Sequence, residues 1–478
     1  MPTSYRSPSL YLAGRWQADT AATAPVVDPA TGREIGRVPL ADAALVAEAL
    51  DAAERAFAPW RALGAEARGA ILERAAGLLR GGLEEAARHI VLEQGKPLAE
   101  ARLEIASCAG MLEWFAAAGR AAPDRPLPAQ PGFPRRIIRQ EPIGPVAAFA
   151  PWNFPASIPT RKAAAALAAG CPVVVKPAEE TPAGFGFVAR ALHEAGLPPG
   201  VLSVLYGDPG PLSAQVIASP AIRKIAFTGS TRVGCLIGEM AGRLAKPCVL
   251  ELGGHSPVLV LEDADIEMAV ARSVQAKFRN GGQICGSPTR FYIHESRYDA
   301  FADRFAEAVA RLPMGSGLDP ETRLGPMIGA GRVEALHALV TEAVAQGATL
   351  RSGGELPNGP GFFYRPTLLQ DVPETARIMQ EEPFGPVVVL NRFSDREDAL
   401  ARANGTPYAL AAYAFAGSGA GLDWAGAGLD AGLVGLNSYA VVFADTPISG
   451  RRSSGYGSEG GAEGLREYLI PKFLVEEG

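Results

Sequence analysis

The sequence has few of the residues that build disulfides, metal sites or nucleic-acid surfaces. Its 478 residues include five cysteines and five histidines, all widely spaced, and no two cysteines form a C-x-x-C pair. This pattern favours free thiols in a reducing compartment and argues against a zinc site. The net charge is −6 and the basic residues do not cluster, so no positive stripe is available for a phosphate backbone. We therefore expect no metal and no nucleic-acid partner.

Long apolar runs are missing as well. No stretch offers 18 uncharged apolar residues, and the N-terminal MPTSYRSPSLYLAGRW has no apolar core followed by a small-residue cleavage site. These features predict a cytoplasmic protein that has no membrane partner. The composition, 48% hydrophobic and 20% charged, is that of a globular protein, and the length suggests two or three domains.

Helical periodicity is clearest in residues 41–118, where Ala, Leu, Glu and Arg recur at helical spacing and Gly95 and Pro97 interrupt the pattern. Residues 123–134 are too rich in proline for regular structure. The RRIIRQEPIG that follows alternates basic and apolar residues, which predicts an extended crossing strand. The C-terminal LREYLIPKFLVEE predicts a terminal strand.

Between residues 146 and 293, short apolar runs alternate with helical segments. Fully apolar strands joined by helices indicate a parallel sheet covered on both faces, which is the doubly wound α/β plan. Such sheets bind ligands at the carboxyl ends of their strands. The alternation restarts at residue 265 and predicts a second α/β domain up to about residue 460. The strand candidates in this stretch are residues 146–150, 171–176, 201–206, 222–228, 247–252 and 257–261.

Cys285 is the cysteine best placed for chemistry, because it lies in the Gly-rich loop NGGQICG between a helix and a strand. A thiolate in a polar loop can be reached by substrate, although a buried inert thiol is an equal alternative at this point. The other four cysteines (Cys108, Cys171, Cys235 and Cys248) are expected to be small buried side chains.

Two further residues have the chemistry that such a nucleophile needs. In PWNFP, prolines fix the backbone on both sides of Asn153, which suits an oxyanion donor; an ordinary turn asparagine is the alternative. Glu251 ends an apolar strand in LELGGHSP, where a carboxylate is desolvated unless it is paired. It suits a general base or, equally, a structural salt bridge.

Two strand ends could hold a phosphate or a ribose. In FTGSTRVG, Gly229 and Ser230 stand where a strand gives way to a helix, so backbone N–H groups can meet a phosphate. The run has neither G-x-G-x-x-G nor a P-loop lysine. In VVVKPAEETP, Lys176 and Glu179 could meet a ribose, with solvated loop charges as the alternative.

Together, the motifs PWNFP, KPAE, FTGS, ELGG, GQ-x-C and EEPFGP resemble those of the aldehyde dehydrogenase superfamily in order and spacing, over nearly the whole chain. The resemblance implies an α/β fold with three parts. Residues 1–118 and 142–252 would form a Rossmann-like NAD-binding domain, and residues 253–460 an α/β catalytic domain. Residues 119–141 and 461–478 would form a small β oligomerisation segment of a homodimer or homotetramer.

The resemblance also implies a role for each matching residue. Cys285 would be the nucleophile that forms a thioester with the aldehyde, Glu251 the base that activates water, and Asn153 the oxyanion donor. Because Glu179 would accept hydrogen bonds from the ribose hydroxyls and repel a 2′-phosphate, NAD is preferred, with NADP as the less favoured alternative. The cofactor contacts implied are Trp152, Lys176, Glu179, Gly229, Ser230, Glu382 and Phe384.

For the substrate, Arg161 and Arg279 are similar in position to the arginines that hold the substrate carboxylate in succinate semialdehyde dehydrogenases. Two guanidinium groups suit an acidic aldehyde. Succinate semialdehyde is the leading expectation, with glutarate semialdehyde, 2-oxoglutarate semialdehyde and neutral aldehydes as alternatives. A cysteine (thio)esterase without a redox step and a non-catalytic binding protein are the competing classes.

Four residues depart from the pattern of that subgroup. Val442 stands where a serine completes the carboxylate site, and Ser287 replaces a second cysteine used for redox control. His255 replaces the lysine of GGKSP, and Gly286 follows the nucleophile where a β-branched residue is usual. An altered substrate pocket is therefore expected.

Overall fold

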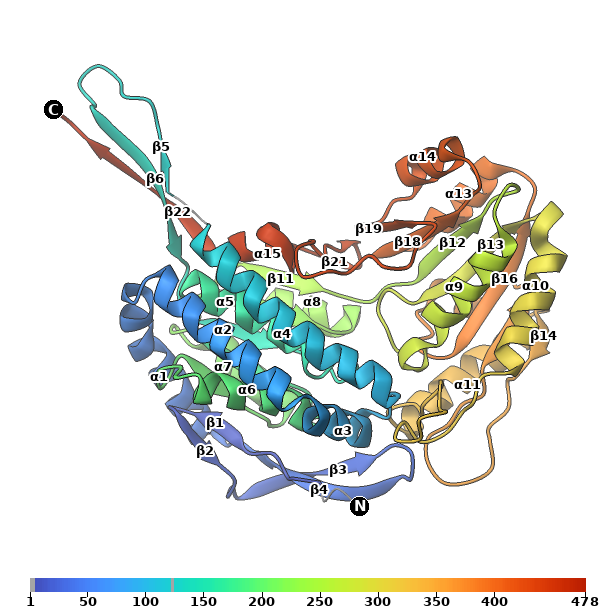
Figure 1. Cartoon of the computed structure of the whole chain (residues 1–478), viewed down its shortest axis with the longest axis horizontal. Helices are drawn as coiled ribbons and strands as arrows, with labels where there is room; N and C mark the ends of the chain where they lie inside the picture. The colour runs from blue at the N-terminus through green and yellow to red at the C-terminus, as the bar shows by residue number, and fades with distance from the viewer. Residues whose placement is uncertain (1–4, 122–123) are drawn as a thin grey trace.

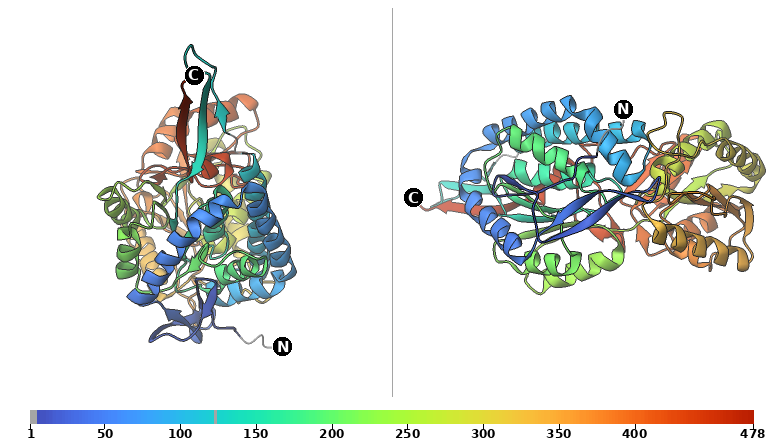
Figure 2. Two further views of the ribbon diagram at one scale, coloured as in Figure 1. Left: turned by 90° about the vertical axis from the view of Figure 1, so that its left-hand side faces the viewer. Right: turned by 90° about the horizontal axis from the view of Figure 1, so that it is seen from below.

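The computed structural model describes residues 5–121 and 124–478. Figure 1 shows two sheets side by side, each covered by helices, and a narrow arm that projects from the first. We call the first sheet with its helices the first unit, and the second sheet with its helices the second unit. Figure 2 shows that the arm extends away from both.

The sheet of the first unit has the order β2-β1-β9-β8-β7-β10-β11-β21. Its five central strands pair in parallel, as the alternation of apolar strands and helices predicted, and the doubly wound plan is confirmed. The edge strands pair antiparallel. The central strands are β7 (Val146–Phe149), β8 (Val173–Lys176), β9 (Leu202–Val204), β10 (Lys224–Thr228) and β11 (Cys248–Glu251); the edge strands are β1 (Leu10–Leu12), β2 (Arg15–Gln17) and β21 (Gly455–Tyr456).

Helices cover both faces of this sheet, as the figures show. Capping residues and glycines set the ends of these helices. Asp42 caps α1 by accepting from the Leu45 N–H at 2.9 Å, and Gly95 ends α3 in the left-handed region at a φ of 91°. The helices are α1 (Ala43–Ala62), α2 (Ala65–Gly81), α3 (Leu83–Gln94), α4 (Leu98–Arg120), α5 (Ser157–Ala169), α6 (Ala183–Glu194), α7 (Pro209–Ala218) and α8 (Thr231–Gly242).

The sheet of the second unit has the order β14-β15-β16-β13-β12-β18-β19, and all its pairs are parallel except β14 with β15. Its strands are β12 (Ser256–Val260), β13 (Pro288–His294), β14 (Thr349–Ser352), β15 (Thr367–Gln370), β16 (Val387–Phe393), β18 (Ala411–Phe415) and β19 (Leu433–Leu436). Its helices are α9 (Ile266–Phe278), α10 (Glu295–Ala310), α11 (Ala330–Ala345), α12 (Arg377–Gln380), α13 (Arg396–Asn404) and α14 (Gly419–Gly428).

The arm joins distant parts of the chain. The C-terminal strand β22 (Leu469–Glu476) pairs antiparallel along the whole of β6 (Arg135–Pro142), as Figure 1 shows. Both strands agree with the sequence prediction. The proline-rich run before β6 contains the short strand β5 (Arg125–Pro126), which periodicity did not predict, and Pro123 of that run lies outside the described residues.

The sequence analysis also missed the hairpin of β3 (Ala22–Asp28) and β4 (Arg33–Leu40), which packs beside α3. Two minor strands, β17 (Tyr408–Ala409) and β20 (Arg451–Arg452), pair with each other. The short helix α15 (Gly461–Arg466) leads into β22.

The cysteine predictions are partly wrong. Cys108 and Cys171 are buried as expected, but Cys235 is exposed and Cys248 only half-buried. Cys235 lies on α8, whose buried face is formed by Gly234, Ile237 and Ala241, so position 235 points to solvent. Cys248 is the first residue of the short strand β11, where burial is incomplete.

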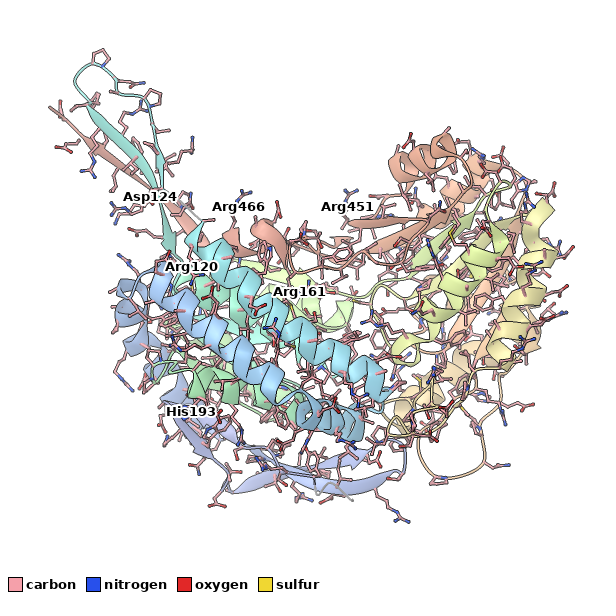
Figure 3. The ribbon with its side chains drawn as sticks, in the orientation of Figure 1. Arg120, Asp124, Arg161, His193, Arg451 and Arg466 are labelled. Atoms are coloured by element: carbon pink, nitrogen blue, oxygen red, sulfur yellow. The ribbon has the colours of Figure 1, made fainter. Side chains whose placement is uncertain are left out.

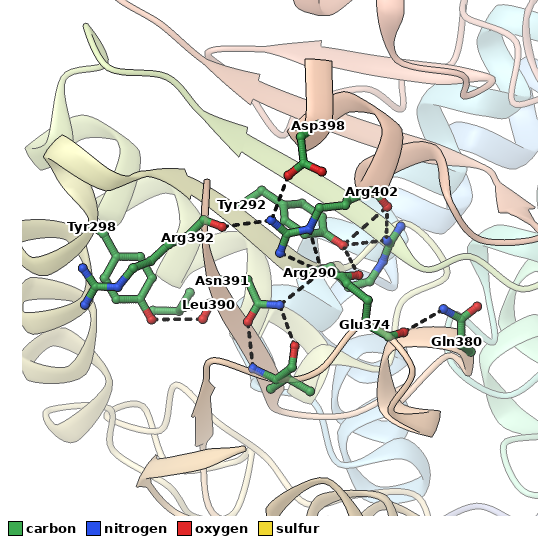
Figure 4. A network of polar contacts seen from close by, with 11 residues as sticks. Arg290, Tyr292, Tyr298, Glu374, Gln380, Leu390, Asn391, Arg392, Asp398 and Arg402 are labelled. Carbon is green, nitrogen blue, oxygen red and sulfur yellow. Dashed lines mark hydrogen bonds and ion pairs between the residues drawn. The ribbon is translucent and has the colours of Figure 1, made fainter. Parts of the chain in front are cut away.

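A polar network ties the second sheet to its covering helices (Figure 4). Arg290 on β13 is 1% exposed and donates to the carbonyl oxygens of His255 at 3.0 Å and Ala403 at 2.9 Å. Arg402 on α13 pairs with Glu374 at 2.8 Å, and Glu374 accepts from the hydroxyl of Tyr292. Arg290 therefore anchors the carbonyl of His255, which precedes β12.

We expect Arg290→Met to lower the free energy of unfolding by about 2–4 kcal/mol, because it leaves several buried carbonyl oxygens without a donor. Arg392→Met is the control. Arg392 lies 3.9 Å over the ring of Tyr298 with its side chain 46% exposed, so its loss should cost less than about 1 kcal/mol. Urea denaturation of both variants measures the difference, and equal losses would contradict the role given to Arg290.

Candidate active site

The thiol of Cys285 and the carboxylate of Glu251 meet between the two units. Cys285 lies in the loop between α9 and β13, and Glu251 is the last residue of β11. Their Sγ and Oε1 atoms are 3.1 Å apart. Burial, and after it the neighbouring Glu251, raises the pKa of Cys285 well above its ordinary value. A nucleophile and a base are therefore in contact, and the thiol form is favoured at rest.

A chain of buried polar groups holds the Glu251 carboxylate at Oε2, the oxygen that does not contact Cys285. Its Oε2 accepts from the hydroxyl of Thr228 at 3.0 Å, and the Lys162 ammonium donates to the same hydroxyl oxygen at 2.6 Å. Lys162 also forms an ion pair with Glu459. Sequence reasoning missed these three residues, because a lysine inside the alanine-rich helix α5 shows no motif of its own.

Asn153 is fixed against the loop that carries the nucleophile. Its Nδ2 donates to the carbonyl of Gln283 at 3.0 Å, and its side chain is buried. Its Oδ1 is also buried and finds no donor within the described parts of the chain. One amide hydrogen therefore remains for a bound group beside Cys285. The structure brings Asn153, Glu251 and Cys285 together.

Two adjacent clefts run along the carboxyl ends of the first sheet and share Trp152, Gly229 and Ser230. One, of about 390 Å³, reaches Cys285, Asn153, Glu382 and Phe384. The other, of about 570 Å³, reaches Lys176 and Glu179. All seven residues predicted to contact the cofactor line this pair of clefts.

The residues fit a dinucleotide. Ser230 is the N-cap of α8, so the first N–H groups of the helix are close to Gly229, where a pyrophosphate can be held. A Cβ atom at Gly229 would lie 2.5 Å from the ring of Phe227, so any other residue at this turn would force that ring to move. Farther along, Lys176 contacts the Glu179 carboxylate at 2.7 Å, and Glu179 accepts from the Gly207 N–H at 3.0 Å.

The opposite wall comes from the second unit. Glu382 accepts from the Gly254 N–H at 3.2 Å, and burial raises its pKa to about 8. The ring of Phe384 meets Trp152 edge-on, with the centroids 5.5 Å apart. Arg332, which sequence reasoning missed, lines the same wall and has a buried Nε without an acceptor among the residues described.

The two predicted substrate arginines do not line the cleft that reaches Cys285. Arg161 on α5, labelled in Figure 3, is only 9% exposed. Its buried Nη1 finds no acceptor within residues 5–121 and 124–478. Arg279 is exposed directly after α9, with its guanidinium 5.7 Å from the ring of Phe154. Of the two predicted arginines, Arg161 is thus the one with an unused buried donor.

The structure also shows where the four residues that depart from the subgroup pattern lie. Ser287 accepts from the buried ammonium of Lys277 at 3.3 Å, and burial lowers the pKa of Lys277 to about 7. The Gly286 carbonyl accepts from the hydroxyl of Tyr413 at 2.7 Å. Val442 is exposed at 48%. His255 is buried, and its burial lowers its pKa well below the ordinary value.

Within residues 5–121 and 124–478, no group of three His, Cys, Asp or Glu side chains could hold a metal ion. No helix in those same ranges has the length and apolarity to span a bilayer.

The Glu251–Cys285 contact predicts how the thiol reacts. Glu251→Gln removes a negative charge 3.1 Å from Sγ, so the pKa of Cys285 should fall and the thiolate fraction rise tenfold for each unit of change. We expect alkylation of Cys285 by iodoacetamide at mildly alkaline pH to be about tenfold faster. Mass spectrometry measures it, with the exposed Cys235 as internal control. Slower alkylation would mean that Glu251 takes the proton from the thiol.

Comparison with known proteins agrees with this geometry. The Aldehyde dehydrogenase family profile matches residues 16–474. A 4-(hydroxymethyl)benzenesulfonate dehydrogenase of Comamonas testosteroni is 42% identical over 98% of both chains. The succinate-semialdehyde dehydrogenase (NADP(+)) of Escherichia coli is 39% identical over 96% of both. The crystal structure of a Burkholderia pseudomallei succinate-semialdehyde dehydrogenase superposes with a TM-score of 0.97 at 40% identity, covering 100% of this chain and 99% of the other. The chain belongs to the aldehyde dehydrogenase family, whose enzymes oxidise aldehydes to acids with NAD or NADP.

Proposed function

We propose that this enzyme oxidises an aldehyde that carries an anionic group at its far end, with succinate semialdehyde as the leading substrate and NAD as the preferred cofactor. The main support for this reaction is the 3.1 Å contact of Cys285 with Glu251, at the end of the cleft whose residues fit a dinucleotide. A cysteine (thio)esterase would have no use for the cleft lined by Lys176, Glu179 and Ser230.

Each residue of the site has its own role in the proposed reaction. Once Cys285 has lost its proton, its Sγ attacks the aldehyde carbon, and the free amide hydrogen of Asn153 and the backbone N–H of Cys285 stabilise the oxyanion. Glu382 and Phe384, which line the cleft that reaches Cys285, would hold the nicotinamide of the cofactor, and the chemistry it would supply is acceptance of the hydride. Glu251 then takes a proton from water, which hydrolyses the thioester and frees the acid. Thr228 and Lys162 hold the Glu251 carboxylate in place for that step.

The anionic substrate is supported by Arg161. A buried guanidinium nitrogen without an acceptor costs free energy unless a ligand meets it, and a carboxylate suits it best. Arg279 would be the second donor of the predicted pair. The relatives named above act on a semialdehyde acid or on an aryl sulfonate alcohol, and all such substrates bear an anion away from the reacting carbon.

A panel of aldehydes tests the proposal. We expect kcat/KM for succinic or glutaric semialdehyde to exceed that for butanal by about tenfold to a hundredfold, because a desolvated charge-assisted contact contributes roughly 1.5–3 kcal/mol. Arg161→Gln should erode this preference and leave butanal oxidation comparatively unchanged. NADH formation is the measurement, and an aryl aldehyde sulfonate tests for a longer substrate.

Cys285→Ala is the control, since it should abolish NADH formation with every aldehyde. Equal oxidation of neutral and acidic aldehydes would contradict the preference for an anionic substrate but not the dehydrogenase activity. Residual turnover in Cys285→Ala would contradict the role of Cys285 as the nucleophile.

We also propose the three-part division predicted from the sequence. The ranges 1–118 and 142–252 would bind the cofactor and 253–460 would complete the catalytic site, although β21 within the last range pairs with the first sheet. The arm of residues 119–141 and 461–478 would join copies of the chain in a homodimer or homotetramer. Its exposed Ile470, Phe473 and Val475 support an interface of this kind.

The preference for NAD rests on Glu179. Its carboxylate would repel the 2′-phosphate of NADP at short range. We expect Glu179→Gln to raise the kcat/KM ratio of NADP to NAD by about tenfold or more. Steady-state kinetics with both cofactors measure the ratio, and Glu194→Gln, an exposed carboxylate at the end of α6, is the control. An unchanged ratio in Glu179→Gln would show that this carboxylate does not face the ribose.

A further inference from the structure

The turn of residues 95–97 is wedged between the two units. Gly95 ends α3 with a φ of 91°, and the Leu98 N–H that follows the turn donates to the Gly317 carbonyl at 2.9 Å. A Cβ atom at Gly317 would lie 2.3 Å from the carbonyl oxygen of Lys96, and one at Gly325 would lie 2.1 Å from that of Gly95. The turn and the 313–327 loop of the second unit therefore pack backbone against backbone.

This turn directs the Lys96 side chain inward, to the backbone of Asn153. The ammonium group, whose side chain is 0% exposed, donates to Glu104 Oε2 at 2.6 Å and to the carbonyl oxygen of Asn153 at 2.8 Å. The other oxygen of Glu104 accepts from the N–H groups of Ala156 and Ser157 at 2.9 and 3.1 Å. Lys96 and Glu104 thus hold the backbone from Asn153 to the start of α5.

A second contact reaches the same carbonyl from the nucleophile loop. Asn280 Nδ2 donates to the Asn153 carbonyl at 2.9 Å and lies 3.2 Å from the Gln283 carbonyl. Gln283 also accepts from the side chain of Asn153 at 3.0 Å. Asn153 is therefore held at its carbonyl by Lys96 and Asn280, and at its amide by the loop that carries Cys285.

We propose that Lys96 is a positioning residue that, together with Asn280, aims the amide of Asn153 at the oxyanion formed on Cys285. This inference rests on the oxyanion role that the proposed function gives to Asn153. Because Lys96 belongs to the turn that packs between the two units, it also couples the packing of the units to the geometry of the oxyanion site.

The contacts explain how a buried lysine is accommodated at position 96. A buried ammonium is costly to desolvate, and two acceptors together with a ring 4.1 Å away offset that cost. Without the ammonium, the Asn153 carbonyl keeps a single donor and the Glu104 carboxylate loses its cation. The backbone at 153–157 can then shift, and a displacement of about 1 Å costs up to about a hundredfold in rate.

Lys96→Met tests the proposal because methionine keeps most of the apolar stem. We expect kcat to fall about 10- to 100-fold while KM for the cofactor stays within about twofold. Alkylation of Cys285 by iodoacetamide should be unchanged, because that reaction forms no oxyanion. In an Asn153→Ala background, Lys96→Met should lower kcat by less than about twofold further, since the two residues act through one group.

Asn280→Gly is the second variant, and it serves if Lys96→Met does not fold. Glycine accepts the φ of 50° found at position 280, so the loop is retained while the donor to Asn153 is lost. We expect the same fall in kcat and the same lack of additivity. The matched control is Lys224→Met, which removes another buried lysine, paired with Glu467 at 2.8 Å, and should leave kcat within about twofold.

Four results would overturn the proposal. Losses that add fully in the Asn153→Ala background would show that Lys96 acts elsewhere, and so would slower alkylation of Cys285. A fall in kcat of equal size in Lys224→Met would show a general effect of losing a buried lysine. If Asn153→Ala itself keeps full kcat, the oxyanion role in the proposed function fails, and the positioning role fails with it.

Discussion

The active site depends on bringing a thiol from a loop of the second unit and a carboxylate from the first sheet to within 3.1 Å of each other. The two sheets must therefore keep one relative arrangement, and glycine makes this possible. A Cβ atom at Gly254 would lie 2.2 Å from the carbonyl oxygen of Cys285, and one at Gly282 would lie 2.2 Å from that of Gly385. A side chain at either position would clash with backbone and displace the loop that carries Cys285, and with it the thiol that contacts Glu251.

Buried charge is the second constraint, and it is concentrated where the chemistry is. Lys96 and Lys162 each meet a carboxylate inside the protein, at Glu104 and Glu459. Burying such a pair costs several kcal/mol per ion before the partners attract, so these pairs contribute less to stability than to fixing hydrogen-bond directions. Lys277 has no carboxylate partner among the residues described, and burial accordingly lowers its pKa to about 7.

Residues that act at a strand end or in a glycine-rich loop could be predicted from the sequence, because their neighbours fix their place. Asn153 between prolines, Glu251 at the end of an apolar run and Cys285 among glycines are of this kind, and the structure brings them together. Thr228, Lys162 and Asn280 could not be found in this way, since their roles come from contacts between distant segments. The hairpin of β3 and β4 was missed for another reason, since few of its side chains are buried and its strands show no clear alternation. The exposure of Cys235 depends on how α8 is rotated against its sheet.

His255 shows how a departure from the family pattern can be accommodated. It stands where the resemblance leads us to expect lysine, yet Arg290 and Lys277 already bring positive charge to this region, and with burial they lower its pKa. The ring is therefore neutral. Its Nε2 lies 3.0 Å from the Ile378 carbonyl, which can only accept, so Nε2 carries the hydrogen and Nδ1 accepts from Thr289 at 2.7 Å. A neutral ring with both nitrogens satisfied thus fills the place of a cation, and it sits directly after the glycines on which the approach of Cys285 to Glu251 depends.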